Sequence, residues 1–137
     1  MRELFLEDTI RSILLSIIES WGSRSFQQQA PFAVQLSITS CILVLFGGLS
    51  ESYKVDVFSA SQMLNAGGSF LESSFPDIRE LGMIAFETMS RAVHPKELQL
   101  NFKLDFNLPY ELRLRALVNL PRLGFLTDLQ KSPNSTA

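Results

Sequence analysis

The 137-residue sequence has only one cysteine, Cys41, and one histidine, His94. A single cysteine cannot form an intramolecular disulfide, and this is typical of a reducing, intracellular compartment. One cysteine and one histidine also cannot supply the ligand set of a usual zinc site, so we expect no metal and no other cofactor. Because Cys41 lies within an apolar segment, we expect a buried structural thiol.

The sequence also has little excess charge of either sign and few motifs typical of catalysis. The chain has 12 basic and 14 acidic residues and a net charge of −2, so no direct nucleic-acid binding is expected. No nucleophile-elbow pattern occurs, and Gly47-Gly48 and Gly67-Gly68 lack the Lys-Ser/Thr of a phosphate-binding loop. His94 has no evident acid–base partner. We therefore predict that the protein is not an enzyme.

What the sequence does contain is helical periodicity. Apolar residues recur at three-to-four-residue spacing, which predicts helices at about 3–21, 31–46, 53–72 and 76–94. Residues 22–30, rich in serine and glutamine, are expected to form a polar loop.

The first helix has a long apolar stripe, with Glu7 and Arg11 expected to pair on the opposite side. The stripe consists of Leu6, Ile10, Ile13, Leu14, Ile17, Ile18 and Trp21. The second helix is apolar nearly all round, which favours a fully buried helix.

For the third helix the pattern predicts one buried face. This face consists of Val57, Ala60, Leu64 and Leu71. Gly67 and Gly68 lie on or near it and are expected to weaken or split the helix.

The fourth helix has apolar residues on two sides, which is typical of an inner helix in a stacked array. One stripe consists of Ile78, Leu81, Ala85 and Met89, and Met83 and Phe86 lie on the other side. Gly82 lowers helix propensity, so we expect a neighbouring helix to approach closely there. Pro76 suits the first turn, Ser73, Ser74 or Asp77 could cap it, and Pro95 ends the helix at His94.

These elements predict an all-α fold. Residues 1–108 are expected to form an α-solenoid of HEAT-like antiparallel helix pairs, because the first and third helices start roughly 50 residues apart. The partial alternation from Leu98 to Phe106 predicts a short extended segment laid against the helices. Residues 109–130 are predicted to be a short helix or irregular extension, and residues 131–137 a disordered tail.

The short helix is expected at Tyr110 to Leu120, with Leu112, Ala116 and Leu117 on one side. Two helix pairs are fewer than a solenoid usually needs, so we also expect exposed apolar surface at one or both ends.

A membrane anchor is the alternative interpretation of residues 31–48. The segment from Gln27 to Ser50 has no charged residue and approaches the roughly 20 residues that span a bilayer. Four polar residues interrupt it, Gln35, Ser37, Thr39 and Ser40, so we consider membrane association unlikely and burial within helices the better interpretation.

An ordered series of short strings resembles a known family. The series includes Glu19-Ser20-Trp21-Gly22-Ser23, Phe70 to Ser74, Arg79 to Ile84, Ser90-Arg91, His94-Pro95 and Leu100-Asn101-Phe102. Over about residues 15–104 it is similar to the central region of the telomere length regulation protein family. The matching residues expected to be structural are Trp21, Arg79, Leu81, Gly82, Met83, His94, Pro95 and Phe102.

This resemblance implies an interaction scaffold: a subunit of the TTT cochaperone complex. The expected partners are Tti subunits, PI3-kinase-related protein kinases, which the complex stabilises, and the heat-shock chaperone machinery, and the expected location is cytoplasmic and nuclear. Such a protein supports telomere maintenance and DNA-damage signalling. The predicted partner-binding surface consists of Arg79, Glu80, Arg91 and Lys96. The acidic, serine-containing linker that follows this region in the family has no counterpart in residues 131–137, KSPNSTA.

Overall fold

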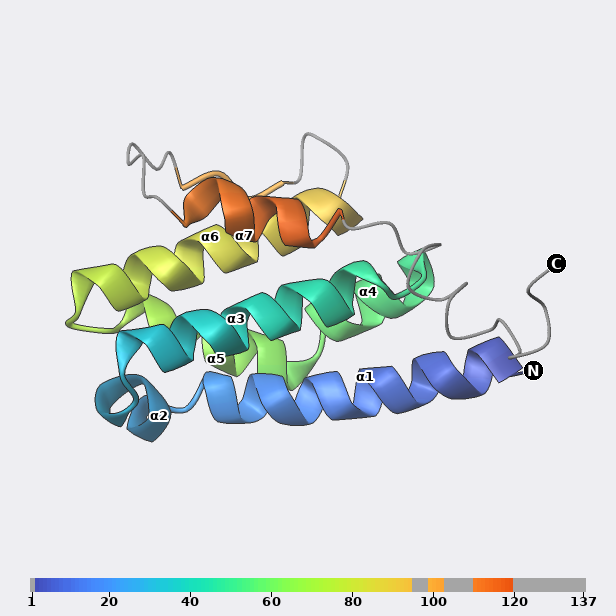
Figure 1. Ribbon diagram of the computed structural model, residues 1–137, viewed down its shortest axis with the longest axis horizontal. Coiled ribbons are helices and arrows are strands. Elements are labelled where there is room, and N and C mark those ends of the chain that lie inside the picture. The colour runs from blue at the N-terminus through green and yellow to red at the C-terminus, as the bar shows by residue number, and fades with distance from the viewer. Residues whose placement is uncertain (1, 95–98, 103–109, 120–137) are drawn as a thin grey trace, which may run out of the picture.

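The computed structural model describes residues 2–94, 99–102 and 110–119, and within them the regular secondary structure is entirely helical (Figure 1). The described residues form α1 (Arg2–Trp21), α2 (Arg24–Gln29), α3 (Phe32–Gly47), α4 (Glu51–Phe58), α5 (Ser61–Leu71), α6 (Pro76–Val93) and α7 (Glu111–Leu117). No strand occurs among them, which confirms the all-α prediction.

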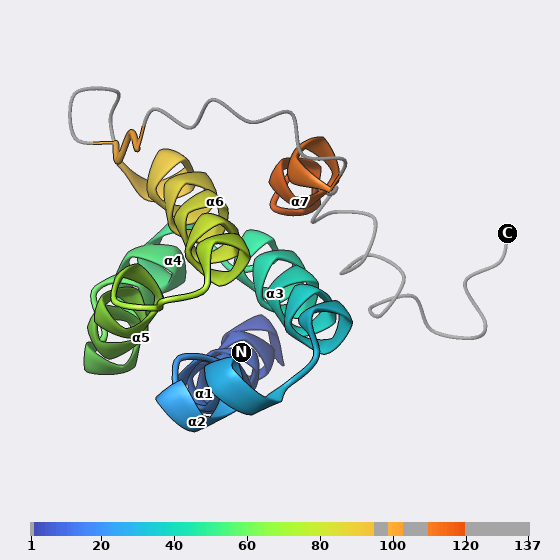
Figure 2. The same ribbon diagram turned by 90° about the vertical axis from the view of Figure 1, so that its left-hand side faces the viewer.

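The long helices pack as a closed square. Helix α1 packs against α3 and α5, and α6 packs against α3, α4 and α5. Viewed end-on, α1, α3, α6 and the α4–α5 pair occupy the four corners, and α7 covers α3 and α6 from outside (Figure 2). In Figure 1, α3 is antiparallel to α1, and α6 is antiparallel to the α4–α5 pair.

A single aromatic junction joins the four corners. The Trp21 ring of α1 lies 4.4 Å from Phe70 of α5 and 5.9 Å from Phe86 of α6, centroid to centroid. Its indole N–H donates to the Thr39 hydroxyl of α3 at 2.8 Å. All three partners therefore hold this tryptophan in a buried site, where its polar group is satisfied.

The predicted buried stripe of α6, Ile78, Leu81, Ala85 and Met89, is buried in the structure. Gly82 is the point where α5 comes closest, because a Cβ placed there would lie 2.6 Å from Phe70 side-chain atoms. The prediction of a close helix approach at Gly82 is confirmed.

The ends of α6 are partly as predicted. Pro76 occupies the first turn and the helix ends at Val93, with His94 as its C-cap. The N-cap is Phe75, which provides no side-chain cap; Ser73 instead accepts a hydrogen bond from the Phe75 amide. Asp77 accepts one from the next amide in the chain.

Two element boundaries differ from the prediction. Residues 22–30 are not a loop throughout, because the Ser23 hydroxyl accepts from the Phe26 amide and starts the short helix α2. The third helix is split between Ser59 and Ala60, where the backbone of Ala60 is extended, rather than at the two glycines, which lie within α5. The apolar spacing continues across this break and therefore conceals it.

The prediction that Cys41 is a buried thiol is wrong, because Cys41 lies on the exposed side of α3. The helix turns Gln35 and Thr39 inward, where Gln35 donates to the carbonyls of Gln27 and Ala30. An apolar pattern that runs all round a helix cannot show which side is covered. Here the inner side includes polar side chains that make hydrogen bonds, Gln35 to two carbonyls and Thr39 to the Trp21 indole.

Glu7 also turns inward instead of lying opposite the core. It is 6% exposed and accepts hydrogen bonds from the amide and hydroxyl of Ser50, at 2.7 and 3.2 Å. Arg11 pairs with Asp56 of α4 at 2.6 Å. These two residues therefore tie α1 to α4 and to the turn before it.

The predicted apolar faces of the third helix and of the short helix after Tyr110 are only partly buried, with Val57 in the core and Leu117 packed against it. Helix α5 buries Met63, Ala66 and Phe70, whereas Leu64 is 69% and Leu71 49% exposed. Helix α7 buries Leu114, and the Leu112 side chain is 81% exposed.

Parts of three predictions lie outside the described residues. Of the expected extended segment from Leu98 to Phe106, residues 99–102 are described and have no regular secondary structure. The predicted tail at 131–137 and most of the 109–130 extension beyond α7 lie outside. The division into these three regions stays a prediction.

We predict that Gly82→Ala destabilises the fold. The added methyl group would overlap Phe70, so overpacking of about 1–3 kcal/mol should exceed the roughly 1 kcal/mol gained in helix propensity. The free energy of unfolding in urea measures this.

Gly68→Ala is the matched control on α5. A Cβ at Gly68 meets nothing within 4 Å, so at low protein concentration this variant should be at least as stable as the parent chain. Equal stabilisation by both substitutions would contradict the close packing at Gly82.

Candidate functional site

An apolar groove of about 430 Å³ lies along α5 and α6. Helix α5 contributes Leu64, Gly67, Gly68 and Leu71, and α6 contributes Met83 and Phe86 to its walls. The full lining is Phe58, Met63, Leu64, Gly67, Gly68, Phe70, Leu71, Gly82, Met83, Phe86, His94, Leu100 and Phe102. None of these is Asp, Glu, Lys or Arg, so the groove suits an apolar surface rather than a charged ligand.

The two glycines make the floor of the groove on α5. Gly67 lies under Phe86, whose ring atoms would be 3.3 Å from an added Cβ, and the space above Gly68 is open. Leu64 and Leu71 flank the glycines as exposed side chains. The groove therefore has both protruding leucines and a depression between them.

Residues 99–102 border the groove and are held along α6 by side chains that accept from their backbone. The Leu100 amide donates to the Ser90 hydroxyl, and the Phe102 amide donates to the Glu87 carboxylate, both at 2.9 Å. The Gln99 side chain donates to the His94 carbonyl at 3.0 Å. Three contacts thus place Leu100 and Phe102 at the groove although the segment has no regular secondary structure.

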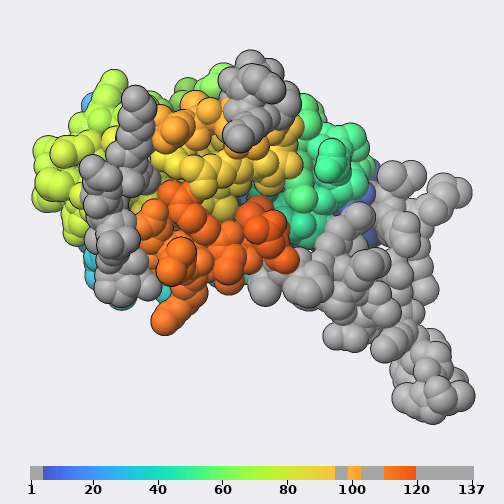
Figure 3. Space-filling view, turned by 90° about the horizontal axis from the view of Figure 1, so that it is seen from above, coloured from blue at the N-terminus to red at the C-terminus, as the bar shows by residue number. Residues whose placement is uncertain are grey.

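Glu87 is the buried carboxylate that organises this side of the molecule. Its side chain is 2% exposed and pairs with Arg91 at 3.1 Å and with Arg115 of α7 at 3.5 Å. Arg115 also pairs with Glu111 at 3.2 Å. One carboxylate therefore joins α6, α7 and residues 99–102, which form one continuous surface in Figure 3.

The structure separates the predicted family-motif residues into two groups. Gly82, Met83, His94 and Phe102 line the groove together. Trp21 and Leu81 are buried in the core, Arg79 donates to the Ser73 carbonyl at 2.7 Å, and Pro95 lies outside the described residues. The His94 ring packs edge-on against Phe58, with centroids 5.4 Å apart.

The predicted partner-binding charges are spread along α6. Arg79 and Glu80 lie near its start and Arg91 near its end, about 18 Å further along the axis. Arg91 pairs with Glu87, and Lys96 lies outside the described residues. The structure thus does not bring these four into one patch within its described part.

Glu87 and the α5 side of the groove are not among the site residues predicted from the sequence. The Glu87–Arg91 spacing of four residues was a usable signal for an ion pair, although not for its burial. For the groove, the usable signal was the regular spacing of Leu64, Gly67, Gly68 and Leu71.

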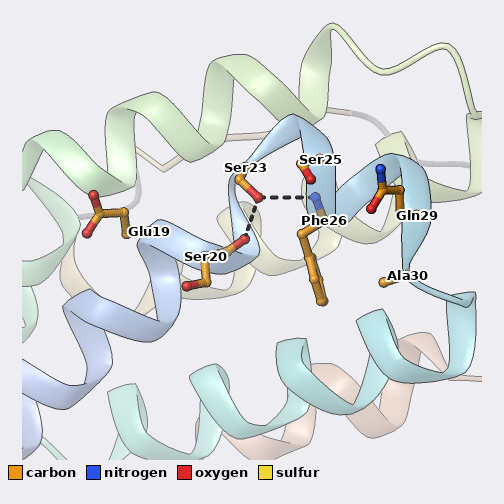
Figure 4. Close-up of a pocket in the computed structure, with 7 residues that line it drawn as sticks. All are labelled: Glu19, Ser20, Ser23, Ser25, Phe26, Gln29 and Ala30. Atoms are coloured by element: carbon orange, nitrogen blue, oxygen red, sulfur yellow. Dashed lines mark hydrogen bonds between the residues drawn. The ribbon is translucent and has the colours of Figure 1, made fainter.

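A wider recess of about 670 Å³ lies at the corner between α1 and α2 (Figure 4). Its Ser23 hydroxyl donates to the Ser20 carbonyl and accepts from the Phe26 amide, and the Glu19 carboxylate points away from it in the figure. Ser23 therefore has the role of a helix cap, and the recess has no base positioned to activate a serine.

Helix α3 packs against α1, α6 and α7, but it is not fully buried as predicted, because Val34 is 43% and Val44 37% exposed. In the part of the chain that the structure describes, no helix combines the length and hydropathy needed to cross a membrane. The same residues contain no group of His, Cys, Asp and Glu able to hold a metal ion.

Burial raises the pKa of Tyr110 to about 12, with Glu80, Asp77 and Glu111 adding to the shift by repulsion of the phenolate. Tyr110 precedes α7 and packs on Phe32 of α3, with ring centroids 5.6 Å apart. Its protonation state is therefore linked to the docking of α7.

Over the residues that the structure describes, the fold is all-helical and built from paired helices, with an apolar surface groove along α5 and α6. The chain is a distant homologue of the telomere length regulation proteins and belongs to their family, and the resemblance found in its sequence is confirmed. It is 32% identical over 124 residues to the telomere length regulation protein TEL2 homolog of Mus musculus, an alignment covering 89% of this chain. It is 31% identical over 96 residues, 68% of this chain, to the Homo sapiens protein of the same name. To the Xenopus laevis protein it is 28% identical over 131 residues, 91% of this chain.

The aligned segments make up 15%, 11% and 15% of the mouse, human and X. laevis proteins, so this chain matches a small part of each. No protein-family model and no solved structure matches the chain.

We predict that Glu87→Gln loosens α7 and residues 99–102. The amide keeps an acceptor for the Phe102 amide but leaves Arg91 and Arg115 without their shared charge, a loss of about 1–3 kcal/mol. Urea unfolding should measure the loss, and hydrogen exchange at the Leu100 and Phe102 amides should become faster.

Glu72→Gln is the control, because its ion pair with Arg24 is exposed on both sides. Unchanged exchange at Leu100 and Phe102 in Glu87→Gln would contradict the role of this carboxylate.

We predict alkaline destabilisation through Tyr110. A tyrosine titrates near 10 in an unfolded chain and at about 12 here, so its contribution to stability is complete below pH ~10 and disappears as pH rises through ~12. Tyrosinate absorbance of the native protein should show a component with a midpoint of about 12 that Tyr110→Phe removes.

Tyr53, the second tyrosine, also has a raised pKa, mainly because its hydroxyl donates to Asp8. It serves as the internal control that remains in Tyr110→Phe. A native titration that Tyr110→Phe leaves unchanged would contradict the assignment.

Proposed function

We propose that this chain is a non-enzymatic protein-interaction scaffold: a segment of an α-solenoid of the telomere length regulation kind. The observation that carries the proposal is the similarity to TEL2 homologs along 89% of the chain. The structure adds a helical surface with an apolar groove.

The helix contacts support the solenoid part of the proposal. In a stack of two helix pairs, the first helices contact each other and so do the second helices. Here α1 contacts α5 and α3 contacts α6, while α1–α3 and α5–α6 pack within each pair. Helix α1 begins at Arg2 and α4 at Glu51, a spacing near that of HEAT repeats.

The exposed apolar side chains support the scaffold part. Val34 and Val44 are exposed on the first helix pair, and Leu64 and Leu71 on the second. In a solenoid, neighbouring repeats or partners cover such faces. The mechanism we propose is therefore adaptor binding through helix surfaces, without chemistry.

By its similarity to the telomere length regulation proteins, the chain would act with Tti subunits and the heat-shock chaperone machinery. Its clients would be PI3-kinase-related protein kinases, in the cytoplasm and nucleus. Arg79, Glu80, Arg91 and Lys96 remain the proposed contact charges. Glu80 is the most suitable to test, because Arg79 and Arg91 have structural hydrogen bonds of their own.

A pulldown with purified Tti subunits and a PI3-kinase-related kinase tests the proposal. The tagged chain should retain at least one of them, and Glu80→Lys should weaken that binding by up to about fivefold, as the loss of an exposed charge pair does.

Glu19→Lys, on the exposed side of α1, is the matched charge-reversal control and should bind like the parent chain. Retention of neither protein would overturn the proposal, and equal weakening by both variants would remove Glu80 from the contact surface.

A further inference from the structure

Helix α7 covers an outer face that α3 and α6 share, here called the α3–α6 face. This face includes Phe32 and Gly47 of α3 and Glu87, Thr88 and Ala92 of α6. Figure 3 shows α7 at the surface of the molecule beside α6. The seven residues of α7 are too few to form a stable helix alone in water. Helix α7 is therefore helical because the α3–α6 face holds it.

One side of α7 makes the contacts with this face. Four residues define that side, at a spacing that places them together on a helix: Tyr110, Leu114, Arg115 and Val118. The Tyr110 ring packs on Phe32, and Leu114 is fully buried. The Val118 backbone lies so close to Gly47 that a side chain at position 47 would overlap it. The α3–α6 face thus fits an aromatic residue, a leucine and a small apolar residue in this order.

The same face contains a buried carboxylate that requires a cation. Glu87 is 2% exposed, and Arg115 of α7 provides one of the two guanidinium groups that pair with it. A helix without a cation at this position would leave the buried charge less compensated. The α3–α6 face therefore favours a helix that combines apolar residues with one arginine.

The fit of α7 to this face is incomplete. A recess of about 210 Å³ remains beside the C-terminal end of α7, lined by Thr88, Arg91, Ala92, Arg115, Val118 and Asn119. The Nη1 atom of Arg115 is buried, and among the described residues it has no hydrogen-bond acceptor. A buried donor without an acceptor lowers the stability of the contact. Helix α7 thus covers the α3–α6 face without filling it.

We propose that the α3–α6 face is a docking surface for a helix of a partner protein, and that α7 is a displaceable occupant of it. The partner helix would have the pattern of α7: an aromatic residue, then leucine and arginine four and five positions later, and a small apolar residue at the eighth. A partner helix longer than α7 would be more stable by itself and could extend into the recess. This inference rests on the proposed adaptor function and specifies the chemistry of one partner.

The first experiment measures binding of a fluorescent peptide with the sequence of residues 110–119 to the purified full chain. A side-chain staple between positions 112 and 116, which are both exposed, holds the peptide helical. The α7 helix of the chain competes with the peptide, so only the undocked fraction of the chain can bind it. Leu114→Ala in the chain weakens α7 docking and should tighten peptide binding about tenfold or more. No gain in affinity overturns the proposal, and so does absence of binding to both chains.

Leu112→Ala in the chain is the matched control, because Leu112 is on the same helix but exposed. This variant should bind the peptide like the parent chain, and an equal gain from both variants would contradict competition by α7. Trp21 fluorescence during urea unfolding checks that the other helices of each variant remain folded, since Trp21 lies at their junction. If Leu114→Ala fails this check, Arg115→Gln replaces it, and the same gain in affinity is required.

Hydrogen exchange tests whether the peptide displaces α7. The Leu114 amide of the chain donates to the Tyr110 carbonyl at 2.9 Å, so it should exchange faster when the peptide saturates an isotopically labelled chain. Amides in the middle of α6 should exchange at an unchanged rate. A peptide that binds without changing the Leu114 amide occupies another place, which overturns the displacement. Because these assays contain only this chain and its own helix sequence, their outcome is independent of Tti or kinase binding.

Discussion

The contact between Phe70 and Gly82 is the constraint on which the rest of the structure depends. Because Gly82 has no side chain, the Phe70 ring lies directly against the backbone of α6 and draws α5 close. Trp21 packs on the same ring and donates to Thr39, so α1 and α3 are tied to the same point. Dense packing of this kind leaves little room for change, since an added methylene displaces several helices together.

This junction also determines where the groove lies. With Met63, Ala66 and Phe70 turned to the core, the opposite side of α5 exposes its leucines and glycines. The Glu87 carboxylate then holds residues 99–102 along α6 and completes the other edge. The buried Glu87 carboxylate pairs with Arg91 and Arg115 and thus positions one edge of the groove. The groove lining itself includes no Asp, Glu, Lys or Arg.

Much of the fold could be predicted, and much of the candidate site could not. The stripe of α6, its end at His94 and the close approach at Gly82 followed from helical periodicity and from the properties of proline and glycine. The exposed position of Cys41 and the outward side of Leu64 did not follow. Both residues lie in helices with apolar residues on several sides, where periodicity alone does not identify the buried side.

The sequence by itself determined that this protein is helical, which segments form the long helices, and its kinship with the telomere length regulation proteins. These properties depend on local spacing and on residue order, which the sequence contains directly. Only the tertiary structure decided which side of α3 and α5 faces solvent, and that Glu87 is buried. Those outcomes depend on which helices pack together, and hydrogen bonds such as Trp21 to Thr39 join residues that are far apart in the chain.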